Sequence, residues 1–263
     1  MKIAVIGAGA IGGVVAAYLK KAGEDVTLIA RQSQVDVLNA KGLTISGVRG
    51  KETFQIPALT ALDKPYDLAI FAVKTQDIEE AFAHNSEYLE TTPVVLTTQN
   101  GVQADNLLSS HFEKTQQMSS IVMFGATYVS EGEVTLNFEG DWIIGRPFTP
   151  LDPTTHKIVA VLSKAFKVVI AGNIIGQKYV KLFVNFNNCI PALIGKSMQE
   201  TFADMDLCRL SIMLLKEGVG IIESSKIDLE SMPDFPKERI LGLAGMPIDQ
   251  AAGIINKTLT GLS

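Results

Sequence analysis

The stretch Gly7-Ala8-Gly9-Ala10-Ile11-Gly12 decides the fold, because it joins a short apolar run to a segment of apolar and small residues. The run at residues 2–6 predicts a strand, and residues 10–22 predict a helix. Glycines at this spacing permit a tight turn and let a pyrophosphate approach the free N–H groups of the helix amino terminus. Glycines also serve ordinary turns and helix packing. The strand-turn-helix context nevertheless indicates that residues 7–12 bind a dinucleotide.

The pattern repeats along the first half of the chain. Apolar runs at residues 25–30, 67–73 and 93–98 predict further strands, and residues 76–89 and 102–112 predict helices between them. Such alternation is typical of a parallel sheet with crossover helices. We therefore expect an α/β fold with a doubly wound sheet of the Rossmann type.

Two regions depart from this alternation. Residues 43–48 and 53–56 predict small peripheral strands, and short β runs between residues 121 and 145 are expected to complete the far edge of the sheet. After a strand at 168–171 the sequence becomes helical, with long helices predicted at 174–193 and 203–225. We expect a cofactor-binding Rossmann domain at residues 1–171. A smaller all-helical domain at residues 172–263 is expected to serve substrate binding or dimerisation.

Composition excludes several classes of protein. The chain has 263 residues, of which 47% are hydrophobic and 19% charged, as in a globular protein. Its net charge of −5 argues against a nucleic-acid partner. No secretory signal and no run of about 20 apolar residues is present, so we expect a cytoplasmic protein without a membrane anchor. Cys189 and Cys208 are too few for a disulfide framework. The three histidines, His84, His111 and His156, are isolated, so no metal is expected.

Arg31 stands at the end of the second predicted strand, about 20 residues after the glycine motif. A site that is specific for NAD places Asp or Glu there to hold the ribose hydroxyls. A guanidinium can pair with the 2′-phosphate of NADP but cannot accept a hydrogen bond from a hydroxyl. The sequence therefore favours NADP(H), with a solvated surface arginine as the alternative.

Polar residues follow two further strands where the sheet ends. In open α/β sheets ligands lie beyond the carboxyl ends of the strands, so Lys74 and Asn100 are candidates for the site. The amide of Asn100 can bridge cofactor and substrate, since it offers both a donor and an acceptor. Lys74 could support a phosphate or ribose, and Gln76 could do likewise or simply be exposed. Asn100-Gly101 could instead form a hairpin turn, but the following residues predict a helix.

Lys181, Asn185 and Asn188 have the spacing i, i+4 and i+7, which places them on one face of the predicted helix at 174–193. A lysine and amides in one stripe suit a 2-keto acid. The ammonium attracts the carboxylate and can protonate the carbonyl oxygen, while the amides donate hydrogen bonds. The alternative is that the stripe faces water.

Four blocks together resemble the ketopantoate reductase (2-dehydropantoate 2-reductase) family. They are residues 6–12, Ala72-Val73-Lys74-Thr75-Gln76, Gln99-Asn100-Gly101-Val102, and Lys181-Leu182-Phe183-Val184-Asn185 with Asn187-Asn188. The resemblance implies an enzyme of pantothenate biosynthesis with its substrate between the two domains. It implies that Lys181 is the proton donor, with Lys178 as the nearby competitor. It also implies that Asn100 contacts nicotinamide and substrate, that Lys74 contacts the cofactor, and that Asn185 and Asn188 hold the substrate.

The carboxyl end departs from this family. Similar proteins continue through a Ser-containing and a Gly-Arg-Pro-Thr-Glu-like segment, which the residues up to Ser263 lack. We therefore expect the helical domain to be incomplete there. The leading hypothesis is NADPH-dependent reduction of ketopantoate to pantoate. Reduction of another branched 2-keto acid, or a non-catalytic NADP-binding redox sensor, are the alternatives. The helical domain could pair with a second copy to form a homodimer.

Overall fold

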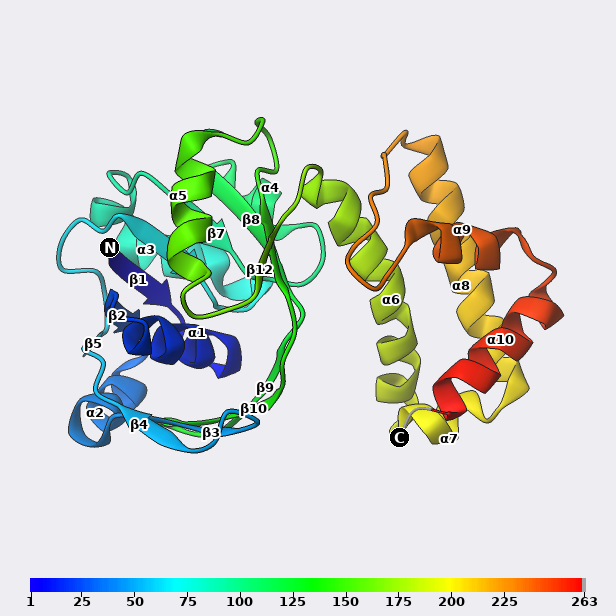
Figure 1. The fold of residues 1–263 in the computed structure, drawn as a ribbon, viewed down its shortest axis with the longest axis horizontal. Helices are drawn as coiled ribbons and strands as arrows, with labels where there is room; N and C mark the ends of the chain where they lie inside the picture. Colours follow the sequence, from blue (N-terminus) through cyan, green and yellow to red (C-terminus); the bar gives the residue numbers. More distant parts are fainter. Residues whose placement is uncertain (262–263) are drawn as a thin grey trace. The chain divides into compact units, whose positions relative to one another are not determined.

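The computed structural model describes residues 1–261, and the chain divides into two compact units between Ile174 and Ile175. The first unit is built on an eight-stranded sheet (Figure 1). Its strands, in spatial order, are β12 (Val168–Ile170), β11 (Trp142–Gly145), β8 (Gln117–Val122), β7 (Val95–Thr97), β6 (Leu68–Phe71), β1 (Lys2–Ile6), β2 (Asp25–Ile29) and β5 (Ala58–Leu59). Neighbouring strands from β8 to β5 are parallel, whereas β11 is antiparallel to β8. This confirms the predicted α/β class.

Helices cover both faces of this sheet because its strands alternate their side chains between two cores. In β1, Ile3 and Val5 face a core shared with α1 (Ala10–Lys21) and α5 (Pro153–Leu162), while Ala4 and Ile6 face a second core. That second core contains residues of α3 (Ile78–Leu89) and α4 (Ala104–Leu108). Helix α2 (Gln32–Lys41) buries only Val35 and Leu38.

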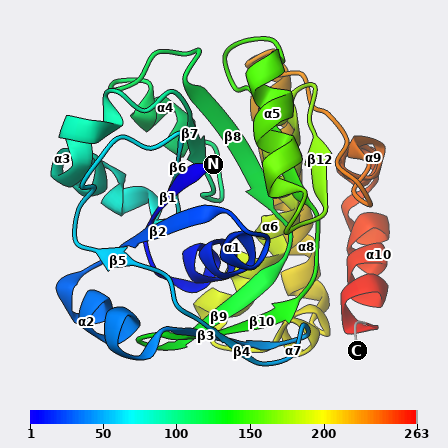
Figure 2. The same cartoon turned by 60° about the vertical axis from the view of Figure 1, so that its left-hand side comes forward.

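A separate four-stranded sheet corrects one prediction. It contains, in order, β4 (Glu52–Phe54), β3 (Leu43–Gly47), β10 (Glu133–Phe138) and β9 (Gly125–Ser130). The predicted peripheral strands are present, but β9 and β10 do not extend the main sheet, as was expected for residues 121–145. The chain leaves the main sheet after β8, pairs β10 with β3 in parallel, and returns as β11. Helix α1 lies between the two sheets (Figure 2).

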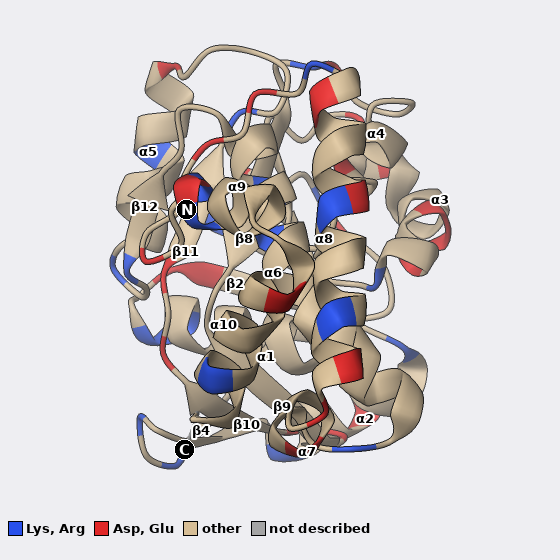
Figure 3. Cartoon of the chain, turned by 90° about the vertical axis from the view of Figure 1, so that its right-hand side faces the viewer, with Lys and Arg blue, Asp and Glu red and all other residues tan. Residues whose placement is uncertain are grey.

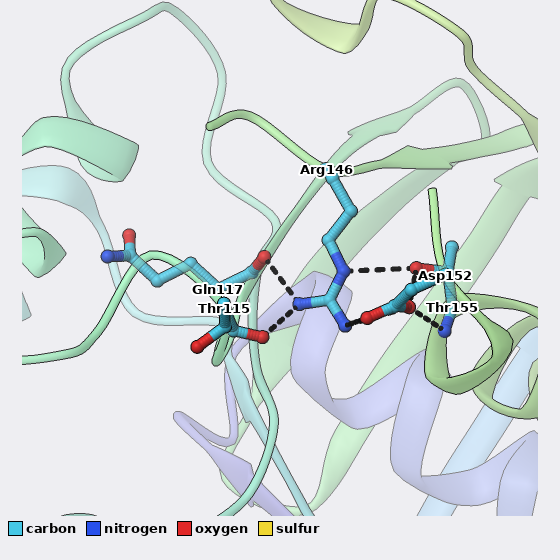
Figure 4. A network of polar contacts seen from close by, with 5 residues as sticks. All are labelled: Thr115, Gln117, Arg146, Asp152 and Thr155. Carbon is cyan, nitrogen blue, oxygen red and sulfur yellow. Dashed lines mark hydrogen bonds and ion pairs between the residues drawn. The ribbon is translucent and has the colours of Figure 1, made fainter. Parts of the chain in front are cut away.

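Arg146 joins three parts of the first unit just after β11, where it is 5% exposed. Its Nη1 donates to the carbonyl oxygens of Thr115 (2.6 Å) and Gln117 (3.0 Å), and its Nε donates to Oγ1 of Thr155 (3.0 Å). Its Nη2 donates to both carboxylate oxygens of Asp152, which caps α5 by accepting from the Thr155 N–H (2.7 Å). Figure 4 shows the guanidinium at the centre of these contacts. The network ties the end of β11 to β8 and to the start of α5.

The second unit is helical. Its helices are α6 (Ile174–Ile194, which begins at the last residue of the first unit), α7 (Met198–Phe202), α8 (Met205–Ser224), α9 (Lys237–Gly245) and α10 (Ile248–Thr260). Helices α9 and α10 pack on α8. Acidic and basic residues of α8 are interspersed on the face drawn in Figure 3. Within residues 1–261, no helix has the combined length and apolarity needed to cross a bilayer.

Candidate active site

The glycine turn between β1 and α1 is shaped by close backbone approaches. Gly7 has a φ of 109°, and a Cβ there would lie 2.9 Å from the backbone of Ala72 and Val73. A Cβ at Gly12 would overlap the carbonyl oxygen of Gly7. At Gly9, by contrast, a Cβ would meet nothing within 4 Å. The two outer glycines are therefore required by packing, while the middle one borders open space.

The amino terminus of α1 beside Gly9 is suited to an anion. No side chain caps this helix, and its first turn contains no acidic residue. The first N–H groups of a helix have no partner within the helix, and its dipole places partial positive charge there. Residues 7–12 thus fit the pyrophosphate of a dinucleotide.

Arg31 lies where the sequence places it, two residues after β2 ends at Ile29 and as the amino-terminal cap residue of α2. Its side chain is exposed. The Gly7 N–H donates to the Ile29 carbonyl at 2.8 Å, so the end of β2 adjoins the glycine turn. A guanidinium can pair with a phosphate, so Arg31 is a candidate contact for the ribose end of a dinucleotide.

Lys74 and Asn100 follow neighbouring strands, β6 and β7, and both side chains are exposed. Lys74 precedes the short 3-10 helix η1 (Thr75–Asp77), which also contains Gln76. Gly101 has a φ of 81°, so the backbone turns sharply after Asn100. The residue that follows does not return as a hairpin strand, although α4 is shorter than predicted and begins only at Ala104. The first unit therefore brings the glycine turn, Lys74 and Asn100 to one edge of the sheet.

Helix α6 carries all three residues of the predicted stripe, but they differ in exposure. Lys181 and Asn185 are partly buried and Asn188 is exposed. The Asn188 amide donates to Oδ1 of Asn185 at 3.4 Å, so these two side chains lie side by side. Asn187 has a different role, because its Oδ1 accepts from the Ser211 hydroxyl of α8 at 2.7 Å.

The two lysines of α6 differ in their surroundings. Lys178 is only 2% exposed, whereas Lys181 keeps part of its side chain accessible. Burial lowers the pKa of Lys181 from its usual value of 10.5, because removing the ammonium from water disfavours the charged form. A lysine in this state is a stronger acid than a solvated one. Elsewhere in residues 1–261, no three His, Cys, Asp or Glu side chains gather as a metal site.

A family model described as ketopantoate reductase PanE/ApbA matches residues 3–147. The chain belongs to this family. A ketopantoate reductase relative from Pyrococcus horikoshii, described as 2-dehydropantoate 2-reductase, is 29% identical over 89% of this chain and 77% of its own length. A 2-dehydropantoate 2-reductase from Archaeoglobus fulgidus is 30% identical over 62% of this chain and 53% of its own length.

Solved structures share the fold. A PanE/ApbA family ketopantoate reductase from Ralstonia eutropha superposes with a TM-score of 0.78 at 22% identity, over 98% of this chain and 97% of that one. A D-mandelate dehydrogenase with NADH and anilino(oxo)acetate has a TM-score of 0.81 at 20% identity, over 100% of this chain and 82% of that one. The chain is therefore an oxidoreductase of the ketopantoate reductase family with the fold of these proteins.

Three polar residues, beside the glycine turn or the turn that carries Asn100, have contacts that the sequence does not predict. The Gln34 amide donates to the Ala8 carbonyl (3.3 Å) and to the Tyr128 hydroxyl oxygen (3.2 Å), which links α2 and β9 to the glycine turn. Gln99 and Asp105 are buried around the turn that carries Asn100. The sequence offers a signal for two of them, because Gln99 is a polar residue after a buried strand and Asp105 lies in the first turn of a helix. The contact between Gln34 and Tyr128 is 94 residues apart along the chain and has no local signal.

Proposed function

We propose that this chain reduces a 2-keto acid with NADPH, and that ketopantoate is its preferred substrate. One observation carries this proposal. The open glycine turn, Lys74 and Asn100 follow three neighbouring parallel strands, β1, β6 and β7, so they lie together at the carboxyl ends of these strands. Membership of the ketopantoate reductase family supports the substrate. Residues 7–12 would hold the pyrophosphate, Arg31 the 2′-phosphate, and Lys74 and Asn100 the part of the cofactor nearer the nicotinamide.

The chemistry follows from the polarity of a 2-keto acid. Bound NADPH would supply the hydride for C2 from its nicotinamide. As the C2–hydrogen bond forms, the carbonyl π electrons move to oxygen, and Lys181 gives that oxygen a proton from its Nζ. Asn185 and Asn188 would donate hydrogen bonds to the substrate, and Asn100 would contact both nicotinamide and substrate. The products are the 2-hydroxy acid and NADP, and Lys181 regains its proton from water.

Steady-state oxidation of NADPH, with ketopantoate and several other branched 2-keto acids, tests the proposal. We expect the highest kcat/KM for ketopantoate. A tenfold preference for another acid would assign that acid as the substrate. Binding of NADPH without turnover of any acid would instead favour a non-catalytic NADP-binding sensor. The homodimer, the cytoplasmic location and the lack of a nucleic-acid or metal partner stay predictions.

Arg31→Ala is expected to raise the KM for NADPH about 10- to 100-fold, because a charge-assisted contact contributes about 1.5–3 kcal/mol. NADH lacks the 2′-phosphate, so its KM should change little. The same variant thus provides its own control. A wild-type preference for NADH, or equal weakening of both cofactors in Arg31→Ala, would mean that Arg31 is an ordinary surface residue.

The pH dependence of reduction should report Lys181. A proton donor must be charged, so kcat/KM for the 2-keto acid is expected to be level near neutrality and to fall as the pH rises through the pKa of Lys181, which burial lowers from 10.5. Profiles of kcat/KM measure this midpoint, because they report the enzyme before the acid binds. Lys181→Ala should lack the inflection. A wild-type profile that stays flat beyond pH 10.5 contradicts the assignment.

A further inference from the structure

The turn at residues 98–103 presents Asn100 on an exposed tip, but the residues that anchor it on either side are buried. Gly101, with its φ of 81°, follows Asn100 directly, so the local backbone alone leaves the tip adjustable. Thr98 and Gln99 are 9% and 7% exposed, and Asp105 is 1% exposed. The position of Asn100 is therefore set by the residues that flank it.

Gln99 holds the first end of this turn. Its Nε2 donates to the carbonyl oxygens of Phe71 (2.9 Å) and Val73 (2.8 Å), and its Oε1 accepts from the Thr98 N–H (3.1 Å). Both amide hydrogens and the amide oxygen are thus used. Since Val73 directly precedes Lys74, one side chain joins the backbone beside Lys74 to the backbone beside Asn100.

Asp105 holds the other end. Its carboxylate accepts from the hydroxyls of Thr97 (2.7 Å) and Ser119 (2.9 Å), which are 2% and 0% exposed. These contacts fix the first turn of α4 against β7 and β8. A buried carboxylate is costly unless it is hydrogen-bonded, so both hydroxyls matter for its placement.

The hydrogen bond from Gln99 to the Val73 carbonyl is not needed to pair β6 with β7. The Phe71 carbonyl at the end of β6 already accepts from the Thr98 N–H (3.2 Å) and the Thr98 hydroxyl (2.9 Å), which pair β6 with β7. The bond from Gln99 to the Val73 carbonyl lies beyond the end of β6, in the segment that leads to Lys74. It therefore constrains the two candidate site segments relative to each other and adds little to strand pairing.

We propose that Gln99 is a positioning residue, which fixes Asn100 relative to Lys74, and that Asp105 secures the same turn from its far side. The proposal rests on the function proposed above, in which Asn100 contacts nicotinamide and substrate. Gln99 acts through Asn100 and touches neither. Loss of its amide loosens the turn without removing any group from the site.

Hydrogen exchange of the cofactor-free protein tests the first part. Gln99→Met keeps the length of the side chain and removes its hydrogen bonds. We expect exchange at least about tenfold faster in peptides that cover residues 72–76 and 98–103, and unchanged exchange in β1 and α1. Gln103→Met, at an exposed position of the same turn, is the control and should leave exchange unchanged. Unchanged exchange in Gln99→Met overturns the proposal.

A double-mutant cycle tests the link to Asn100. Gln99→Met should lower kcat about 10- to 100-fold per NADPH-binding site, because a displaced group loses alignment with the reacting atoms. Asn100→Ala should also lower kcat, and the double variant should be no slower than Asn100→Ala within about threefold, since both changes remove one contribution. If the kcat losses of the two single variants multiply in the double variant, the positioning role of Gln99 is overturned, while the proposed role of Asn100 stands. Wild-type turnover in Asn100→Ala overturns both this role and the proposed role of Asn100.

Asp105 gives a second pair of variants that does not depend on Gln99→Met folding. Asp105→Asn keeps the shape of the side chain and one acceptor, and we expect its kcat within about threefold of wild type. Asp105→Ala removes both acceptors and should slow turnover as Gln99→Met does, with little change in the Kd for NADPH. Equal kcat in Asp105→Ala and wild type, measured per NADPH-binding site, would show that the Asp105 carboxylate serves folding only and would overturn its part in the proposal.

Discussion

Lys181→Ala is expected to lower kcat for 2-keto acid reduction by about 10²- to 10⁴-fold, the usual range for loss of a general acid. Hydride addition to C2 leaves negative charge on the carbonyl oxygen, and alanine cannot neutralise it. Burial already lowers the pKa of this ammonium, which makes proton transfer to the oxygen easier than from a solvated lysine. Steady-state kinetics at saturating substrate and NADPH measure the effect.

Lys178→Met is the matched control for this prediction, because the residue lies one turn earlier on the same helix. Lys178 is 2% exposed, so Lys178→Met should lower the free energy of unfolding. The kcat of the molecules that remain folded should change little. Titration with NADPH counts the folded sites in both variants, and its Kd should remain near wild type. Normal kcat in Lys181→Ala, or a larger loss in Lys178→Met, would assign the proton donor to another group.

Much of the first unit could be predicted from local sequence. Runs such as residues 68–73 are continuously apolar, as expected for parallel strands that are buried on both faces, and the glycine turn fixes where the first strand ends. The same logic located Lys74 and Asn100, since a polar residue after a buried strand must lie at the sheet edge. Helix α2 was missed because it buries only Val35 and Leu38, which gives no helical period.

Long-range pairing explains why the prediction for residues 121–145 was right for β11 but wrong for β9 and β10. Short β runs show that strands exist, but they do not show which strands pair. Here β10 pairs in parallel with β3, with Val134 opposite Ile45, and α1 packs against the sheet they form. That choice depends on burying both strands against α1, which no local pattern contains. Likewise the sequence shows that Asn100 follows a strand, but it does not show the hydrogen bond from Gln99 to the Val73 carbonyl, which depends on how β6 and β7 pair.

Arg146→Met is expected to destabilise the first unit by about 3 kcal/mol, the scale for leaving buried acceptors without their charged hydrogen-bond donor. The Arg146 side chain is 1% exposed and that of Asp152 is 39% exposed, so the pair itself is only half desolvated. The larger part of the loss comes from the carbonyl oxygens of Thr115 and Gln117, which lose their charged donor. For a unit of this size the melting temperature should fall by about 6–12 °C.

Arg209→Met is the control, since Arg209 also forms ion pairs, with Asp206 and Asp249, but its side chain is 43% exposed. Water replaces those contacts when they are lost, so the melting temperature should change much less than in Arg146→Met. Thermal unfolding followed by circular dichroism compares the two. Equal shifts in both variants would mean that burial of the arginine does not decide its contribution to stability. A larger shift for Arg146→Met would locate the stability in the buried junction of β8, β11 and α5, which lies away from the residues proposed to bind cofactor.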